Sequence, residues 1–290
     1  MIARAAFRVE AKLHKNLDDI IDRRTKLKVH RFSINMLSDI VYLCASSVNL
    51  AMTDTRLGRI KAVLFDLDGT LVDTAKSQLL ANTHVVKMLL NFLHSRNVHI
   101  SEQSLLEAIE KLSLEMDLKL LYNRDAWWNE IFKKVNLKGA IPSEFARKLT
   151  LGYWSKYTKG MVKYGDAAPT LKYLKDKGYK LGLVTDTDGT PGIKPKRISR
   201  SSILRLFDVV VIAGEETDKV KPNPSSYLLA LRKLQLKPPE AVYVGDKPFT
   251  DIKGAKALGI ITVLIRRKPW KEYVKPDFTI DNLIQLKSIL

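Results

Sequence analysis

Two aspartates, Asp66 and Asp68, stand at the end of an apolar run and are followed by Gly69 and Thr70. The apolar run, residues 62–65, is typical of a buried parallel strand. In open α/β sheets, ligands bind in the crevice outside the carboxyl ends of the strands. Two like charges delivered there are costly to bury unless a cation or a reaction uses them. The turn therefore predicts a metal ion and a chemical role for both carboxylates.

Three further signals fall at or just beyond the ends of later apolar runs. Thr185 closes the second run, and Lys221 stands in the loop after the third. Asp246 follows the fourth run, with Asp251 a few residues further on. If these runs are parallel strands, their carboxyl ends share one edge of the sheet. We therefore expect residues that are far apart in the sequence to converge there.

These residue types suit phosphoryl transfer. A carboxylate can attack phosphorus and form an aspartyl phosphate, and Asp66 is the candidate nucleophile. A second carboxylate, Asp68, can protonate the leaving oxygen and then deprotonate water, which is worth roughly 10²–10⁴ in rate. Asp66 and Asp246 offer the oxygen ligands that Mg²⁺ prefers, and the cation would relieve repulsion between nucleophile and phosphate. Thr185 offers a hydroxyl donor to a phosphate oxygen, and Lys221 offers a fixed positive charge.

The segments that must position these residues alternate between short apolar runs and helical patterns. The predicted strands are Ala62–Asp66, Lys180–Thr185, Val209–Ala213, Ala241–Gly245 and Ile261–Ile265. The predicted helices among them are Pro169–Asp176, Ile198–Leu206, Ser225–Leu234 and Thr250–Leu258. This alternation predicts an α/β fold with a doubly wound parallel sheet.

One long stretch, residues 78–160, carries no strand signal. Its apolar residues recur at helical spacing, as in the set Val85, Met88, Leu89 and Phe92. We therefore expect an inserted all-helical cap domain above the turn that carries the two aspartates. The predicted domains are an N-terminal helical extension over residues 1–58, a catalytic core over 59–77 and 161–290, and the cap over 78–160.

In its motifs the chain resembles the haloacid dehalogenase superfamily of phosphohydrolases. The motifs are Asp66-x-Asp68-x-Thr70, Thr185, Lys221 and Gly245-Asp246-x-x-x-x-Asp251. The resemblance covers residues 60–290 and is strongest to the phosphoglycolate phosphatase and N-acylneuraminate-9-phosphatase-like branch. It implies a Rossmann-like core, and the inserted helices resemble the superfamily's type I cap. One departure is the stretch 186–197, rich in Gly, Pro and Lys, which leaves the shape of that loop open.

The resemblance also implies roles for the matching residues. Asp66 would be the nucleophile and Asp68 the acid/base. Mg²⁺ would bind to Asp66, to Asp246 and to the backbone carbonyl of Asp68. Asp251 would order either the metal shell or Lys221.

Each signal also has an ordinary structural explanation. Thr185 alone would be a strand-end hydroxyl, Lys221 a solvated surface charge, and Asp251 a residue near a helix N-terminus, where the dipole favours it. Trp127 and Trp128 are expected to belong to the core of the cap. Four signals in order, each at or beyond a strand end, favour the catalytic interpretation over joint coincidence.

The formal net charge of +18 at pH 7 is high for a chain of 290 residues. Basic residues are spread along the whole chain, so we favour a solvated surface, with nonspecific polyanion binding as the alternative. Cys44 is the single cysteine, which excludes an internal disulfide and a thiolate metal site. No stretch is long and apolar enough to span a bilayer and no signal-peptide pattern is present, so we expect a soluble, cytoplasmic protein.

The N-terminal extension has helical periodicity, as in Ile2, Ala6, Val9 and Leu13, but no chemical motif. Met52 stands a few residues before the first predicted strand. One hypothesis is that translation starts at Met52 and that the preceding residues come from an over-extended reading frame. The alternative is a helical pair that docks on the domain or on a partner.

Together these observations predict a Mg²⁺-dependent phosphomonoester hydrolase of a small phosphorylated metabolite, acting through an aspartyl phosphate. Asn123, Arg124 and Trp127 of the cap are candidates for substrate contact. A phosphomutase that uses the same intermediate is the alternative, and a catalytically inactive basic binding module is a further one. A dehalogenase is disfavoured, because carbon–halogen displacement needs neither Mg²⁺ nor an acid at Asp68.

Overall fold

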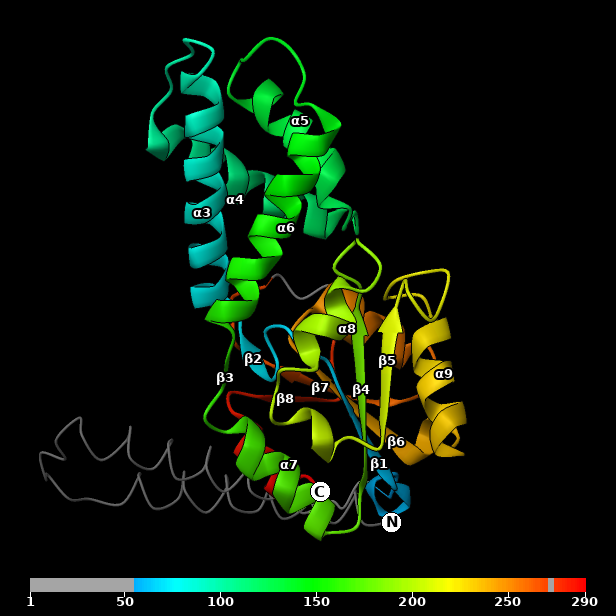
Figure 1. The fold of residues 1–290 in the computed structure, drawn as a ribbon. Coiled ribbons are helices and arrows are strands. Elements are labelled where there is room, and N and C mark those ends of the chain that lie inside the picture. Colours follow the sequence, from blue (N-terminus) through cyan, green and yellow to red (C-terminus); the bar gives the residue numbers. More distant parts are fainter. Residues whose placement is uncertain (1–54, 271–273) are drawn as a thin grey trace, which may run out of the picture. The chain divides into compact units, whose positions relative to one another are not determined.

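The computed structural model describes residues 55–270 and 274–290 (Figure 1). The hypotheses about Met52 and about an N-terminal helical pair concern residues 1–54, which lie outside the described residues. Residues 55–290 form one compact unit. No helix in the described part of this unit has the length and apolar character needed to cross a membrane.

The main sheet has six parallel strands in the order β5-β4-β1-β6-β7-β8. Their bounds are β1 Ala62–Phe65, β4 Lys180–Asp186, β5 Val209–Ala213, β6 Ala241–Gly245, β7 Ile261–Ile265 and β8 Phe278–Ile280. From β1 the chain first winds outward through β4 and β5, then returns to the other side of β1 through β6, β7 and β8. The predicted doubly wound α/β fold is therefore confirmed, and the crevice where the strand order reverses lies at β1.

Strand β1 is buried on both of its faces, as a central parallel strand should be. Val63 and Phe65 belong to one core cluster, which also holds the apolar face of helix α7 (Ala167–Asp176). Leu64 belongs to a second cluster, which holds the apolar face of helix α9 (Ser225–Leu234). Alternate side chains of one strand thus anchor helices on opposite faces of the sheet.

The helix predicted over Ile198–Leu206 is wrong. The structure instead forms helix α8 over Ile193–Ile198, followed by a 3-10 turn, η2, over Leu204–Leu206. Pro195, a residue type that usually breaks helices, stands at the third helical position of α8. The backbone N–H groups of the first turn have no partner within the helix, so a proline is tolerated there.

The other predicted core helices lie where the sequence places them, with one change of type. The segment predicted as helix Thr250–Leu258 forms a π-helical turn, η4, over Pro248–Ile252, which continues into α10 over Lys253–Lys256. Three further 3-10 turns complete the core: η1 Leu57–Arg59, η3 Pro238–Glu240 and η5 Leu283–Ser288.

Strand β8 was not predicted, because its three residues carry too short a pattern to recognise. Its place is set by pairing with β7 and by the side chain of Asp277. The Asp277 carboxylate accepts hydrogen bonds from the backbone N–H of Thr262 at 3.0 Å and from its hydroxyl at 2.7 Å. A contact between distant segments therefore determines this edge strand.

Four helices occupy the stretch between the first two long strands of the sheet. They are α3 Ala75–His94, α4 Glu102–Leu118, α5 Arg124–Lys134 and α6 Ser143–Gly160. They share a core of their own, in which Leu89, Trp128 and Leu149 are fully buried. A two-stranded antiparallel ribbon, β2 Val72–Asp73 with β3 Val162–Lys163, joins the chain where it leaves and re-enters the main sheet. The predicted domain boundaries stay predictions, since residues 55–290 form a single unit.

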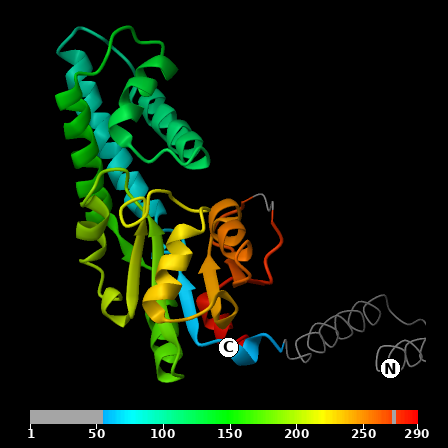
Figure 2. The same cartoon turned by 90° about the vertical axis from the view of Figure 1, so that its right-hand side faces the viewer.

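The four helices stand beyond the carboxyl ends of the strands, as the view at right angles shows (Figure 2). The loop before α5 touches the loop after β4. Beside this contact, the Tyr122 hydroxyl donates to the carboxylate of Asp186, the last residue of β4, at 3.1 Å. Gly189, with a φ of +78°, lies so near the Tyr122 backbone that a Cβ atom would overlap its carbonyl oxygen. The close approach of these two loops therefore requires glycine at position 189.

The Gly189→Ala substitution tests this approach. Gly192 in the same loop also has a positive φ, of +80°, but a Cβ there would meet open space. Both alanine variants carry the backbone strain of a positive φ, about 1–2 kcal/mol, and only Gly189→Ala adds overlap, typically about 1–3 kcal/mol. We expect Gly189→Ala to lower the free energy of unfolding in urea by more than Gly192→Ala does. Equal losses would show that the Tyr122 contact does not constrain the loop.

Candidate active site

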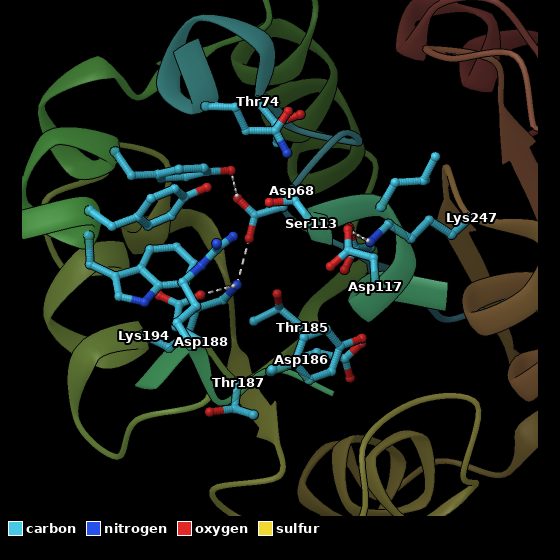
Figure 3. A pocket seen from close by; sticks show the side chains of 18 of the residues that line it. Asp68, Thr74, Ser113, Asp117, Thr185, Asp186, Thr187, Asp188, Lys194 and Lys247 are labelled. Atoms are coloured by element: carbon cyan, nitrogen blue, oxygen red, sulfur yellow. Dashed lines mark hydrogen bonds and ion pairs between the residues drawn. The ribbon is translucent and has the colours of Figure 1, made fainter. Parts of the chain in front are cut away.

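One cavity of about 480 Å³ lies between the carboxyl ends of the strands and the four inserted helices. Asp66, Asp68, Thr185, Lys221 and Asp246 all line it. The structure thus brings together five of the six residues predicted for the site. Figure 3 shows two of them, Asp68 and Thr185, beside another lining residue, Asp186. The sixth, Asp251, is fully buried behind the lining.

Lys221 is the centre of a buried ion cluster. Its ammonium group lies 2.6 Å from Asp66 Oδ1 and 2.7 Å from Asp251 Oδ1. It also donates to the Val184 carbonyl at 3.3 Å and to the Tyr243 hydroxyl at 3.2 Å. Burial alone would lower the pKa of Lys221, but the charges of Asp251 and Asp66 raise it well above its usual value. Lys221 therefore stays a cation and holds Asp66 in place.

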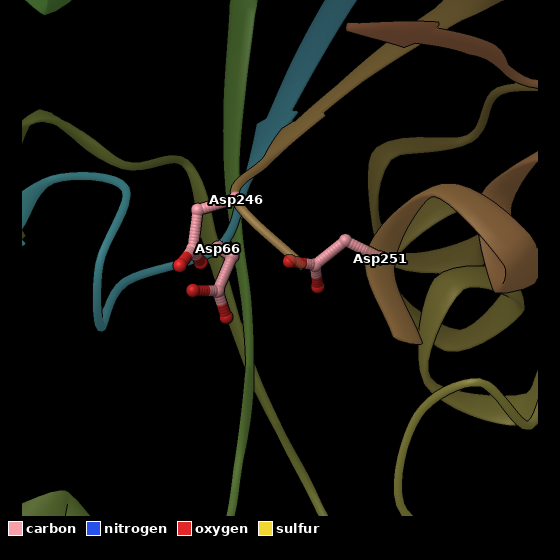
Figure 4. A group of neighbouring side chains, drawn as sticks. All are labelled: Asp66, Asp246 and Asp251. Carbon is pink, nitrogen blue, oxygen red and sulfur yellow. The ribbon is translucent and has the colours of Figure 1, made fainter. Parts of the chain in front are cut away.

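Three carboxylates, from Asp66, Asp246 and Asp251, gather at this end of the sheet (Figure 4). Each offers an oxygen atom, and these atoms lie within 4.8 Å of one another. Burial raises the pKa of Asp246 to about 7, and the neighbouring charges of Asp66 and Asp251 add to the rise. Burial also raises the pKa of Asp66, although Lys221 opposes it. One ammonium group does not balance three buried carboxylates, so the site suits a bound cation.

The oxygen atoms of the three carboxylates are not equally free to bind a metal ion. Asp251 Oδ2 accepts from the backbone N–H of Lys247 at 3.0 Å, and its Oδ1 accepts from Lys221. The Asp246 carboxylate has only a 3.5 Å hydrogen bond from the Thr70 hydroxyl among the described residues. Hard divalent cations prefer such oxygen ligands. The donor set therefore fits a divalent metal held by Asp66 and Asp246, with Asp251 orienting Lys221.

Gly69 lets the backbone of the turn after β1 approach this carboxylate cluster. Its φ is +93°, and a Cβ atom there would overlap the Asp246 carboxylate. Only glycine adopts this conformation at low cost and leaves room for the carboxylate. The residue after Asp68 therefore has to be a glycine if Asp246 is to approach the turn.

Asp68 lies in a second ion cluster, which the sequence analysis missed. Arg197 donates to both of its oxygens, at 2.8 and 2.6 Å, and Lys194 lies 2.5 Å from Oδ2. Both cations also bind Asp188, Arg197 at 2.8 Å and Lys194 at 3.3 Å. Figure 3 shows Lys194 between Asp68 and Asp188. We call Asp68, Asp188, Lys194 and Arg197 the four-charge cluster. It is almost completely buried apart from Asp68, whose side chain is 23% exposed.

The four-charge cluster fixes the protonation state of Asp68. Burial alone would raise the pKa of Asp68, but the charges and hydrogen bonds of Arg197 and Lys194 hold it well below its usual value. The Tyr157 hydroxyl of α6 adds a hydrogen bond at 3.4 Å. In this arrangement Asp68 is a carboxylate, the form that accepts a proton.

The missed members of the cluster come from the stretch 186–197, which departs from the family pattern. In a chain with 49 lysines and arginines, no local signal separates Lys194 and Arg197 from solvated basic residues. Their spacing of three residues places both on one face of a helix, which could have indicated a shared target. The wrong helix boundary hid that spacing.

Two of the three cap residues predicted to contact a substrate line the cavity. These are Arg124 and Trp127. Asn123 does not line it, because its side chain caps helix α5 by accepting from the backbone N–H of Asp125 at 3.1 Å. Trp128 is a core residue, as expected, with its indole N–H donating to the Thr150 hydroxyl at 2.9 Å.

With fold and site described, comparison with known proteins identifies the family. Residues 63–265 match the model of the haloacid dehalogenase-like hydrolases, and the chain belongs to this family. It is similar to a glyceraldehyde 3-phosphate phosphatase of Methanopyrus kandleri, with 32% identity over 238 residues, 80% of this chain and 97% of that one. It is also similar to the N-acylneuraminate-9-phosphatase of Homo sapiens, with 27% identity over 81% of this chain and 95% of that one.

A solved structure shares both the fold and much of the sequence. The crystal structure of a HAD phosphatase from Thermococcus onnurineus is 32% identical, with a TM-score of 0.57 over 79% of this chain and 97% of that chain. The predicted superfamily is therefore confirmed, and phosphatases of its N-acylneuraminate-9-phosphatase-like branch are among the relatives.

Removing Arg197 should be costly, because Asp68 and Asp188 would each lose a charged partner. Breaking a buried ion cluster in this way typically costs about 3–5 kcal/mol. We expect the Arg197→Met variant to lose that much free energy of unfolding in urea. Lys196→Met, at an exposed position of the same helix, is the matched control and should stay within about 0.5 kcal/mol. Similar losses in both variants would contradict the four-charge cluster.

The carboxylate cluster predicts an unusual response to Asp246→Asn. Without a bound cation, the pKa of Asp246 rises to about 7 from the usual 3.8, so this group stabilises the fold below pH 3.8 and loses that contribution as the pH rises through 7. In EDTA at pH 8, we therefore expect the variant to unfold at a higher temperature than the unchanged protein, with a smaller difference at pH 5.

An added divalent cation should affect the unchanged protein and Asp246→Asn differently in the same assay. It should raise the unfolding temperature of the unchanged protein at pH 8 and have little effect on Asp246→Asn. A variant that is less stable in EDTA, or that still responds to the cation, would rule out Asp246 as a ligand in an otherwise repulsive cluster.

Proposed function

We propose that this protein is a Mg²⁺-dependent phosphomonoester hydrolase of a small phosphorylated metabolite, acting through an aspartyl phosphate on Asp66. The observation that carries the proposal is the placement of Asp66. Asp66 lines the cavity, and the Lys221 ammonium group binds its Oδ1 at 2.6 Å. The names of the relatives, which are phosphatases of small phosphorylated compounds, support the same activity.

In the first half of the reaction, a carboxylate oxygen of Asp66 attacks phosphorus and the bond to the leaving oxygen breaks. The leaving oxygen takes up a proton through Asp68, which is a carboxylate in the free site and first accepts that proton from the singly protonated phosphate of the substrate. Thr185 donates its hydroxyl to a phosphate oxygen, and Lys221 supplies positive charge against the transferring group. The products are the free alcohol and a phosphoryl group on Asp66.

In the second half, a water molecule attacks the phosphoryl group on Asp66. Asp68 takes a proton from this water, and the phosphorus–oxygen bond to Asp66 breaks. Inorganic phosphate leaves, and the Asp66 carboxylate is restored. The four-charge cluster supports this half directly, because Arg197 and Lys194 keep Asp68 in its base form.

We assign Asp66 and Asp246 as the side-chain metal ligands, together with the backbone carbonyl of Asp68. Mg²⁺ bound there would supply positive charge that relieves repulsion between the anionic nucleophile and the phosphate. Asp251 is assigned to orient Lys221, since both of its oxygens already accept hydrogen bonds.

The position of the cap over the cavity is the reason for proposing a small substrate. Helices α3, α4, α5 and α6 all contribute residues to the lining of the cavity, so the cap contacts a substrate that is bound there. An alcohol other than water that entered the same cavity could take the phosphoryl group, which keeps the phosphomutase as the alternative. Stoichiometric release of inorganic phosphate from a single phosphoester would exclude it. The cytoplasmic location stays a prediction.

Asp66→Asn tests the mechanism directly. An amide cannot act as the nucleophile, so we expect release of phosphate from a panel of small phosphoesters to fall by at least about 10³-fold. EDTA should abolish the release and Mg²⁺ should restore it. Asp176→Asn, an exposed position on α7, is the control and should keep full activity.

Two outcomes would argue against the proposal. Activity retained by Asp66→Asn would overturn the covalent mechanism. A protein that releases no phosphate from any ester, yet retains nucleic acid at moderate salt, would instead support the basic binding module.

A further inference from the structure

Asp186 lies between the cap and the loop that carries Lys221, and its side chain contacts both. It is the last residue of β4, where its backbone pairs with Ala213 of β5. Its Oδ1 accepts from the backbone N–H of Lys221 at 2.9 Å, and its Oδ2 accepts from the Tyr122 hydroxyl at 3.1 Å. Figure 3 shows Asp186 beside Thr185 in the lining of the cavity. A carboxylate whose backbone is fixed in the sheet therefore links a cap residue to a residue of the reaction centre.

Lys221 depends on contacts of this kind, because it lies in the loop between β5 and α9 and not in a strand. Its ammonium group is fixed by Asp66 and Asp251, at 2.6 and 2.7 Å. A lysine side chain is flexible, so a fixed ammonium group does not by itself fix the backbone. The Asp186 carboxylate supplies a second fixed point, at the backbone N–H. Lys221 is thus held at both ends of its side chain.

The cap contacts the core through the segment 117–122, which covers the end of α4 and the loop after it. Asp117 lies 3.5 Å from the ammonium group of Lys247, which follows β6. Tyr122 reaches Asp186 at the end of β4. Burial and the charge of Asp186 raise the pKa of the Tyr122 hydroxyl, so this group remains a donor. One short cap segment therefore contacts the ends of two strands that carry site residues.

We propose that Asp186 is a positioning residue, which orients Lys221 for phosphoryl transfer and makes that orientation depend on the cap through Tyr122. The inference rests on the proposed function. Hydrogen bonds to a carboxylate are among the stronger ones in proteins, so the two contacts together favour one orientation of Asp186. A group misplaced by about 1 Å can lose roughly 10²-fold in rate, so a residue that holds Lys221 in place affects kcat. No proton or phosphoryl group passes through Asp186 itself.

The first test compares two carboxylates that each accept from a backbone N–H, at opposite ends of β4. Asp186→Ala should lower kcat for the phosphoester that the unchanged protein hydrolyses fastest by about 10- to 100-fold. KM should change by less than about threefold, because Lys221 acts on charge that develops in the transition state. Asp208→Ala is the matched control and should keep both constants. Asp208 accepts from the backbone N–H of Leu181, the second residue of β4, at 2.7 Å.

A conservative variant shows whether the fall in kcat comes from the lost hydrogen bonds. Asparagine has the shape of aspartate, and its oxygen can accept from the Lys221 N–H while its amide group donates to the Tyr122 oxygen. Asp186→Asn should therefore keep kcat within about fivefold of the unchanged protein. A fall as large as that of Asp186→Ala would show that the two hydrogen bonds do not carry the effect, and would overturn the positioning role.

A double-mutant cycle tests the link to the cap. Tyr122→Phe removes a single hydroxyl group and should lower kcat by about 3- to 10-fold. If Tyr122 acts through Asp186, adding Tyr122→Phe to Asp186→Ala should lower kcat by less than about twofold more. An equal effect of Tyr122→Phe in both backgrounds would show that the cap hydroxyl does not act through Asp186.

Hydrogen exchange of the Lys221 backbone amide, followed by NMR, reports the same link without turnover. Asp186→Ala removes the acceptor of this amide and should speed its exchange by at least about tenfold. Tyr122→Phe should speed the exchange by about 3- to 10-fold, because Asp186 loses the contact that orients it. Asp208→Ala should leave the exchange of this amide unchanged.

Two further results would overturn the positioning role: equal falls in kcat in Asp186→Ala and Asp208→Ala, or an unchanged exchange rate of the Lys221 amide in Asp186→Ala. Absence of phosphate release from every ester by the unchanged protein would count against the proposed function instead. The exchange rates of the Lys221 amide would then still decide whether Asp186 and Tyr122 position Lys221.

Discussion

The buried ammonium group of Lys221 allows carboxylates from three segments to share one end of the sheet. It bridges Asp66 and Asp251 at 2.6 and 2.7 Å, and all three side chains are largely buried. Without it, Asp66 would be an uncompensated buried charge, and its placement under the cavity would be unfavourable. Lys221 does not neutralise the third carboxylate, that of Asp246, and the pKa of Asp246 rises to about 7. The same constraint that positions Asp66, the proposed nucleophile, thus leaves a carboxylate that a cation would balance.

A second set of charges connects the sheet to the cap. Arg197 binds Asp68 from the core, while its guanidinium carbon lies 4.9 Å from the Tyr157 ring and 5.3 Å from the Trp154 ring of α6. Asp68, the residue proposed to transfer the proton, therefore shares a partner with the helix that covers the cavity. Arg124 shows the opposite arrangement: it is packed among aromatic rings of the cap and left without a counter-charge. Among the described cavity residues, the cations bound to Asp66 and Asp68 are thus paired with carboxylates, whereas Arg124 is not.

The sequence predicted the sheet well because its strands are short, buried and apolar. Ala241–Gly245 and Ile261–Ile265 were placed without error, since burial on both faces leaves an uninterrupted apolar run. Prediction failed where tertiary contacts decide. The three-residue strand β8 depends on pairing with β7, and helix α8 starts before Pro195, in a first turn that tolerates proline.

Residue types and their order along the chain by themselves determined that Asp66, Thr185, Lys221 and Asp246 would meet, because parallel strands deliver their carboxyl ends to one edge. Only the tertiary structure decided which charges neutralise which. Lys194 and Arg197 pair with Asp68 across more than a hundred residues, and nothing in their neighbourhood along the chain separates them from the other basic residues. Electrostatic partnership depends on distance and burial in three dimensions, and neither quantity is written in a local pattern.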